Sequence, residues 1–202
     1  MSYSIEKSEK VLTLARERGV LHTRDLNDYG IQREYLSRLC KQGRLIKVGR
    51  GRYVLPDMEI SENYNLALVA KAVPGAVICL LSALRFHNIG TQSPFQVWIA
   101  IQNRAASPRI DKPAVRIFRF SGKAFSEGNE EHNIDGVNVK IYNPAKTVAD
   151  CFKYRNKIGL DIAIEALRDG WQQKRFSMDE LWRYSKICRV SNVIKPYLES
   201  LV

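Results

Sequence analysis

Basic side chains concentrate in one short stretch of this sequence. The chain has 202 residues and a formal net charge of +11. Residues 31–55 contain one acid, Glu34, and the basic residues Arg33, Arg38, Lys41, Arg44, Lys47, Arg50 and Arg52. A positive cluster of this density favours contact with a polyanion such as nucleic acid. The chemistry expected of the segment is therefore recognition by charge and hydrogen bonding.

The positive segment contains an amphipathic helix, expected from Gln32 to Gln42. At about 100° per residue, one arc is apolar and consists of Tyr35, Leu36, Leu39 and Cys40. The other arc is polar and consists of Arg33, Glu34, Ser37, Arg38 and Lys41. Such a helix fits a major groove about 12 Å wide, with Arg33 and Ser37 near the end that contacts bases. A solvated helix face has the same pattern, so the flanking elements must decide between the two.

Two helices are expected ahead of this one, in the order of a helix-turn-helix. Residues 5–18 have an apolar face. A short helix follows from about Arg24 to Tyr29, with Thr23 as its expected N-cap. Gly30 then permits the tight turn that leads into the third helix.

A β-hairpin is expected directly after the third helix. The segments 44–48 and 52–55 are β-prone, and Gly49-Arg50-Gly51 lies between them. The two glycines permit the positive φ angles of a hairpin turn. Arg50 and Arg52 at this tip are suited to phosphate or minor-groove contact. Three helices followed by a hairpin with arginines at its tip is the order of a winged helix.

These features together predict a winged helix-turn-helix over residues 1–56 that binds duplex DNA. The DNA-binding residues expected from this pattern are Thr23, Arg24, Gln32, Arg33, Ser37, Arg38, Lys41, Lys47, Arg50 and Arg52. A winged helix that binds another protein is the alternative for this domain.

Residues 57–202 are predicted to form a mixed α/β domain that ends in helices, so the fold class expected is α+β. Strands are expected at 95–101, at 115–120 and on both sides of an Asp-Gly turn within 134–142. Helices are expected at about 62–73, from Ser82 to His87 with Ser82 as its cap, and at 144–154 with Asn143 as its cap and Pro144 at the first position. Further helices are expected at 160–170, after the capping box that begins at Ser177, and within 190–201. Residues 121–132 are polar and loop-like.

Few residues of this second domain have the spacing of a catalytic site. Lys146 and Asp150 are four residues apart on one helix, which is more typical of a surface ion pair than of a catalytic couple. Asp135 and Lys140 weakly resemble the acid and lysine of a nuclease. We therefore expect no enzyme activity, no metal and no cofactor. A metal-dependent nuclease targeted by the winged helix is the alternative.

The cysteines and the apolar segments indicate where the chain resides. Cys40, Cys79, Cys151 and Cys188 are widely spaced and form no zinc-binding pattern, so buried free thiols are expected. No run of about 18 apolar residues occurs, and the first residues lack the pattern of a signal peptide. A cytoplasmic protein without membrane contact is expected.

Several separated motifs of the second domain recur, in this order, in one known family. They are Ser82-Ala-Leu84, Val97-Trp-Ile-Ala100, Arg119-Phe-Ser-Gly122, Val137 to Tyr142, Pro144 to Phe152, Leu160-Asp161 and Glu165 to Asp169. The sequence thus resembles the AbiEi-like regulators, which include the antitoxin of AbiE type IV toxin–antitoxin (abortive infection) systems.

The resemblance implies a bacterial or archaeal regulator with a winged helix and an α/β antitoxin domain. It implies a repressor that binds inverted repeats in its own promoter, and a phage-defence role in which the neighbouring gene encodes a nucleotidyltransferase-like toxin. An antitoxin of this type need not form a stable complex with the toxin. A lone regulator without a toxin is the alternative within the same family.

Overall fold

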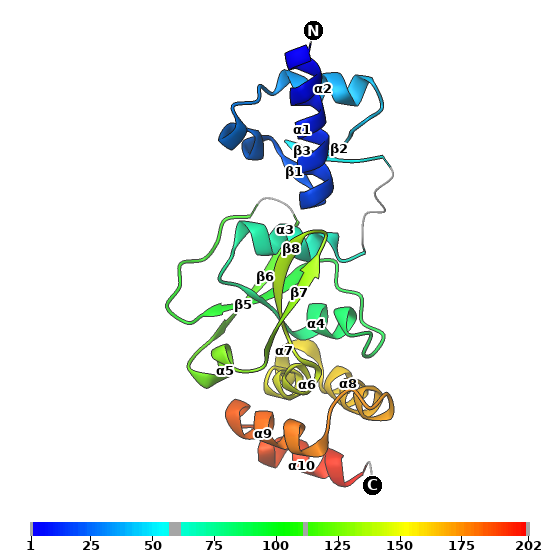
Figure 1. The fold of residues 1–202 in the computed structure, drawn as a ribbon. Coiled ribbons are helices and arrows are strands. Elements are labelled where there is room, and N and C mark those ends of the chain that lie inside the picture. The colour runs from blue at the N-terminus through cyan, green and yellow to red at the C-terminus, as the bar shows by residue number, and fades with distance from the viewer. Residues whose placement is uncertain (1, 57–61, 111–112, 201–202) are drawn as a thin grey trace. The chain divides into compact units, whose positions relative to one another are not determined.

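The structure is a computed structural model that describes residues 2–56, 62–110 and 113–200 (Figure 1). It has mixed α/β content with helices at the C-terminal end, as predicted. The chain divides into two compact units, and each is described here by itself. The first comprises the N-terminal residues to Tyr64 together with Asn133–Val137, and the second comprises the remainder. The boundary predicted at residue 57 falls outside the described residues and stays a prediction.

The N-terminal unit has the order of a winged helix. Its helices are α1 (Ser2–Arg18), the 3-10 helix η1 (Thr23–Tyr29) and α2 (Glu34–Lys41). Its strands are β1 (Leu21–His22), β2 (Ile46–Gly49) and β3 (Arg52–Val54), which form an antiparallel sheet in the order β1-β3-β2. The apolar core of this unit draws on all three helices and includes Val11, Leu14, Leu26, Leu36 and Leu39.

The predicted short helix is present, but Thr23 does not cap it. The 3-10 helix begins at Thr23 itself, and His22 takes the N-cap position in extended conformation. The carboxylate of Asp25 accepts a hydrogen bond from the His22 backbone N–H at 2.8 Å, which satisfies one of the free donors at this end. Gly30 ends the helix with a φ of 61°, as expected for a tight turn.

The second unit contains a five-stranded sheet in the order β6-β5-β4-β8-β7. The strands are β4 (Val77–Ile78), β5 (Val97–Gln102), β6 (Val115–Phe120), β7 (Asn129–Ile134) and β8 (Val137–Tyr142). β4 is antiparallel to β5 and parallel to β8, and β5 is parallel to β6. Residues 129–132 of β7 were expected to be a loop. Only Ile134 of this edge strand is buried, so its sequence lacks the alternation that identifies a strand.

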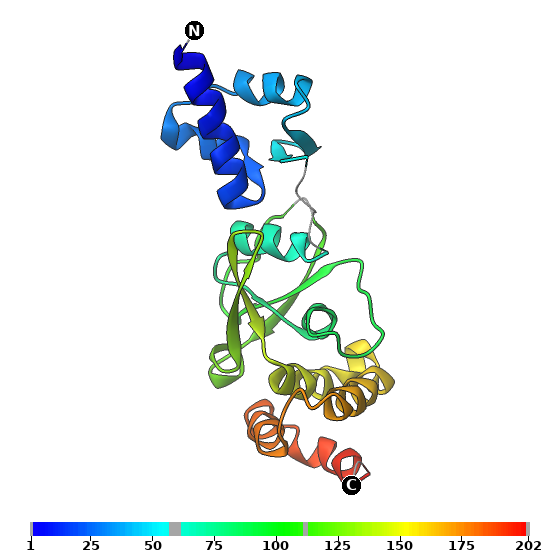
Figure 2. The same cartoon turned by 45° about the vertical axis from the view of Figure 1, so that its right-hand side comes forward.

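Helices cover both faces of this sheet. They are α3 (Tyr64–Ala72), α4 (Leu80–Phe86), α5 (Lys123–Ser126), α6 (Pro144–Lys153), α7 (Arg155–Ile158), α8 (Leu160–Gln172), α9 (Met178–Cys188) and α10 (Ser191–Glu199). Figures 1 and 2 place α3 on the side of the sheet opposite to α6, α8, α9 and α10. Alternate strand residues point to opposite faces, so Trp98 and Phe118 join the core with α6, whereas their neighbour Ile99 is buried on the α3 side.

The expected N-caps are present at the start of α6 and α9 but not at the start of α4. The Asn143 side chain accepts a hydrogen bond from the Lys146 backbone N–H, and Pro144 follows at the first helical position. Ser177 forms a capping box with Glu180 at the start of α9. Ser82 does not cap α4, because α4 begins at Leu80. The Ser82 hydroxyl instead accepts from the Trp98 backbone N–H at 2.8 Å and links α4 to β5.

Lys146 and Asp150 form a buried ion pair, which contradicts the predicted surface position. Both side chains are 0% exposed, and the Lys146 ammonium donates to an Asp150 carboxylate oxygen. The Cys188 thiol donates to the other oxygen at 3.1 Å, and the ammonium lies 4.0 Å from the centre of the Tyr142 ring. The surface interpretation was wrong because α6 packs against α4, α8 and α9 and therefore has little contact with solvent.

We expect Lys146→Met to lower the free energy of unfolding by about 3–5 kcal/mol, because it leaves the Asp150 charge unpaired in the interior. Adding Asp150→Leu to that variant should recover much of the loss, since the pair is then replaced by apolar groups. Urea denaturation followed by circular dichroism measures both effects.

An exposed pair with the same spacing provides the control. Lys195 and Glu199 on α10 lie 3.8 Å apart and are 63% and 67% exposed. Lys195→Met should cost less than about 1 kcal/mol. Equal losses of unfolding free energy for Lys146→Met and Lys195→Met would show that burial does not increase the cost of breaking the ion pair.

Candidate nucleic-acid interface

The two arcs predicted for the third helix are present on α2. Leu36 and Leu39 are 1% and 0% exposed and anchor the helix in the core of the unit. The polar residues of the opposite arc, Arg33, Glu34, Ser37, Arg38 and Lys41, are all exposed. Arg33 takes the N-cap position, so α2 begins two residues later than Gln32, which is also exposed. The polar arc is thus available to a ligand along the whole helix.

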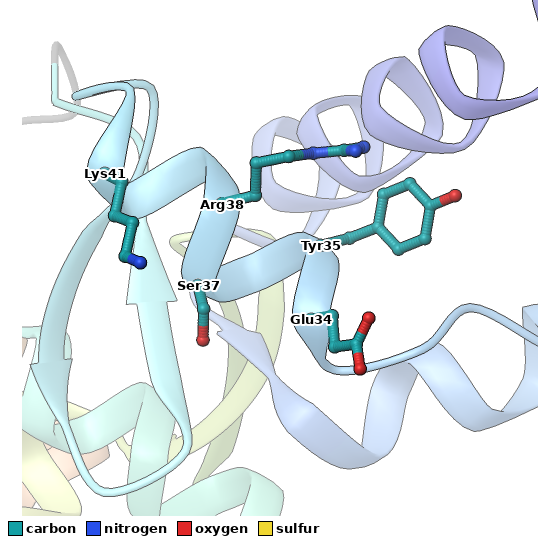
Figure 3. Close-up of a pocket in the computed structure, with 5 residues that line it drawn as sticks. All are labelled: Glu34, Tyr35, Ser37, Arg38 and Lys41. Carbon is teal, nitrogen blue, oxygen red and sulfur yellow. The ribbon is translucent and has the colours of Figure 1, made fainter. Parts of the chain in front are cut away.

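A shallow hollow lies on this face of α2 (Figure 3). It is lined by Glu34, Tyr35, Ser37, Arg38 and Lys41. The Arg38 guanidinium donates to the Ser8 hydroxyl at 2.9 Å and lies 4.6 Å from the centre of the Tyr35 ring. Figure 3 shows Arg38 reaching toward α1, whereas Ser37 points away from it. Arg38 is therefore held at the edge of the face by contacts within the unit.

The turn of the wing contacts the start of η1 through one carbonyl group. The Gly51 carbonyl accepts from the Thr23 backbone N–H at 2.9 Å and from the Thr23 hydroxyl at 3.2 Å. Gly51 has a φ of 69°, the left-handed conformation expected at this turn, whereas Gly49 does not have a positive φ. Thr23 was expected to contact DNA. The structure assigns it a link between η1 and the wing, and its contact with DNA stays a prediction.

The arginines of the wing have different surroundings. Arg50 is exposed at the turn, and Arg52 is half-buried at the start of β3. A Cβ atom added to Gly49 would lie 2.7 Å from a guanidinium nitrogen of Arg52, so the arginine side chain passes over this glycine. The register between β2 and β3 shifts between Lys47 and Gly49. Lys47, on β2 ahead of the turn, is exposed.

Part of the positive charge of the segment is neutralised within the unit. Arg44 pairs with Glu9 of α1 at 2.8 Å, a contact that the sequence pattern does not reveal. Among the described residues, no ion pair involves Arg24, Arg33, Lys41, Lys47 or Arg50. All five cations are exposed on η1, on α2 with its N-cap, or on the wing, and exposed cations are suited to phosphate contact.

The two residues considered for a nuclease site, Asp135 and Lys140, belong to the hairpin of β7 and β8, and Asp135 falls in the N-terminal unit. Asp135 occupies the turn between β7 and β8 with a φ of 50°, and the Lys140 ammonium lies 4.0 Å from Glu131. The His87 ring nitrogen Nε2 lies 2.8 Å from the Tyr142 carbonyl, and burial lowers the pKa of His87. Within the ranges that the structure describes, no three His, Cys, Asp or Glu side chains gather as metal ligands.

The cysteines are free, as expected, and three of them are buried. Cys79, Cys151 and Cys188 lie in the core, and Cys40 on α2 is half-buried. Burial raises the pKa of the Cys151 and Cys188 thiols well above the usual value, so both stay protonated. Across residues 2–56, 62–110 and 113–200, no helix is both long enough and apolar enough to cross a membrane.

Comparison with known proteins agrees with the resemblance inferred from the sequence. Residues 9–56 match the model of a family described as "Transcriptional regulator, AbiEi antitoxin", so the resemblance is confirmed over this stretch. The crystal structure of the RV2827C protein from Mycobacterium tuberculosis matches with a TM-score of 0.57 and 17% sequence identity. The match covers 89% of this chain and 71% of that chain, and it shows a shared fold. A search of curated proteins gave no significant match.

The different surroundings of Arg38 and Lys41 lead to a test on the free protein. Arg38→Ala should lower the free energy of unfolding by about 1–2 kcal/mol, because it removes the bond to Ser8 and the contact with the Tyr35 ring. Lys41→Ala should change it by less than about 0.5 kcal/mol, because Lys41 is exposed. Thermal and urea unfolding measure both values, and equal stability of the two variants would show that the Arg38 contacts contribute nothing.

Proposed function

We propose that this protein is a sequence-specific DNA-binding transcriptional repressor that autoregulates its own operon. We further propose that it acts as the antitoxin of a type IV, AbiE-like toxin–antitoxin system. The observation that carries the proposal is the exposed polar face of α2 beside an arginine-bearing wing, within residues that match the AbiEi regulator model. A regulator that binds DNA is the role this domain supports.

The proposed binding mode assigns separate tasks to α2 and to the wing. The outward face of α2 enters the major groove, where Arg33 and Ser37 are close enough to the helix start to contact base edges. Arginine is suited to guanine, because its two parallel donors match the O6 and N7 acceptors. Arg50 and Lys47 then bind phosphates beside the groove. Phosphate contacts position the domain, and base contacts select the sequence.

The connection between Thr23 and Gly51 supports simultaneous contact by both elements. The two hydrogen bonds to the Gly51 carbonyl hold the wing against the start of η1. The wing thereby keeps a constant position relative to the helix-turn-helix, which lowers the entropy lost when both bind the same duplex. An inverted-repeat operator requires two copies of this domain per site, one on each half-site.

The antitoxin part of the proposal concerns the second unit. The family description of the N-terminal match names an antitoxin, and the motifs shared with AbiEi-like proteins lie mainly within residues 82–169. The expected cognate toxin is a nucleotidyltransferase-like protein encoded by the neighbouring gene. We propose that residues 57–202 counteract the toxin and that residues 1–56 control transcription.

The DNA-binding part predicts tight and salt-sensitive binding to the protein's own promoter. Arg33→Ala should reduce the preference for the promoter over a shuffled duplex by about 1–3 kcal/mol, because it removes a base contact. Arg50→Ala should weaken binding to both duplexes equally and reduce the salt slope by about 1, because it removes a phosphate contact. Fluorescence anisotropy at several salt concentrations measures these values.

The charge-matched control for this experiment is Lys195→Ala on α10, which removes one exposed cation from the second unit. Its binding should equal that of the unmodified chain. No preference for the promoter over the shuffled duplex at moderate salt would disprove specific repression. Unchanged binding by both arginine variants would disprove the assigned contacts.

The antitoxin part predicts that co-expression of the full chain restores growth of cells that express the neighbouring gene product. The combined Arg33→Ala and Arg50→Ala variant should lose repression of a promoter–reporter fusion yet still restore growth. The reason is that the two substitutions leave the second unit unchanged. If the unmodified chain represses the reporter but does not restore growth, the protein is a lone regulator and the antitoxin assignment is wrong.

A further inference from the structure

Glu34 is an unexpected acid on the face of α2 that is proposed to meet DNA. It is the single acidic residue within residues 31–55 and lies in the first turn of α2. Its side chain is exposed and lines the same hollow as Ser37 and Lys41 (Figure 3). A carboxylate at this place is repelled by DNA phosphates, so it weakens binding unless it gains a compensating contact.

The neighbouring cations do not neutralise Glu34. Arg38, which lies four residues further along α2, donates to Ser8 and lies against the Tyr35 ring. Among the described residues, no ion pair and no side-chain hydrogen bond involves Glu34. The carboxylate therefore retains its full capacity to accept hydrogen bonds from a ligand.

The chemistry of the major groove limits what this carboxylate can bind. A carboxylate accepts hydrogen bonds and donates none. Phosphates, guanine O6 and N7, and thymine O4 offer acceptors alone, whereas cytosine N4 and adenine N6 offer amino donors. Adenine presents its N7 acceptor next to the amino group, which repels a carboxylate, so cytosine is the better partner.

We propose that Glu34 is a specificity-determining residue that accepts a hydrogen bond from the cytosine N4 amino group at one position of each half-site. This inference rests on the proposed function, because it requires α2 to enter the major groove. Position on the helix supports it, since the first turn of a recognition helix is the part that reaches base edges. Glu34 then selects by attraction to cytosine and by repulsion from the three other bases.

An acid in the first turn of a helix also has a structural role, because it interacts favourably with the helix dipole. A negative charge there stabilises a helix in the absence of any ligand. That role affects the unfolding of the free protein and has no influence on which base is preferred. Base preference is therefore the measurement that separates the two roles.

The experiment selects bound duplexes from a library in which the operator half-site is randomised, and compares the full chain with its Glu34→Gln variant. The unmodified chain should prefer cytosine at one position by about ten-fold or more. Glu34→Gln should lose that preference and shift toward adenine, because a side-chain amide pairs with adenine N6 and N7. Preferences at the other positions should stay the same.

The matched control is Glu6→Gln, which removes an exposed acid from α1. It should leave the preference for cytosine unchanged, and thermal unfolding checks that both variants are folded. If Glu34→Gln binds all duplexes more tightly by one factor with the same base preferences, the Glu34 inference is wrong and the repressor proposal stands. If the unmodified chain selects no sequence at all, the proposed function fails, and the Glu34 inference fails with it.

Discussion

The burial of Leu36 and Leu39 determines the direction in which α2 presents its polar face. Both leucines are almost fully inaccessible, in a core shared with α1 and η1. Rotation of α2 about its axis would expose these side chains to water. The free-energy cost of that exposure keeps the helix in its orientation. The Leu39 carbonyl also accepts from the backbone N–H of Arg44 at 2.9 Å, so the chain leaves α2 toward β2 in a defined direction. The direction of the polar face of α2 thus depends on one small apolar contact.

The second unit is organised around a different helix. α6 packs on α4, α8 and α9, and its residues from Ala145 to Phe152 are all buried. Such a helix has no face left for surface chemistry, and its polar groups must satisfy one another. The Lys146 ammonium, the Asp150 carboxylate and the Cys188 thiol do so across the contact between α6 and α9. The same burial that unites the helices therefore keeps these groups away from any substrate.

Local patterns predicted most of the elements, but they placed the caps at Thr23 and Ser82 wrongly and did not reveal contacts between distant residues. The arcs of α2, the glycine turns and the caps at Asn143 and Ser177 depend on neighbours within a few residues, so the sequence predicts them. The hydrogen bond from Arg38 to Ser8 joins residues 30 apart, so the periodicity of the sequence does not predict it. The two-residue strand β1 is too short to show alternation, and the polar edge strand β7 has none. The burial of Lys146 depends on α8 and α9, which follow later in the chain.

The ion pair within α6 constrains how relatives of this protein change over time. A lineage that replaced Lys146 first would carry an unpaired carboxylate in its interior, and one that replaced Asp150 first would carry an unpaired ammonium. Each single replacement is an unfavourable intermediate, while the double replacement restores a neutral interior. The two positions should therefore vary together among homologous sequences, as one inherited character rather than two.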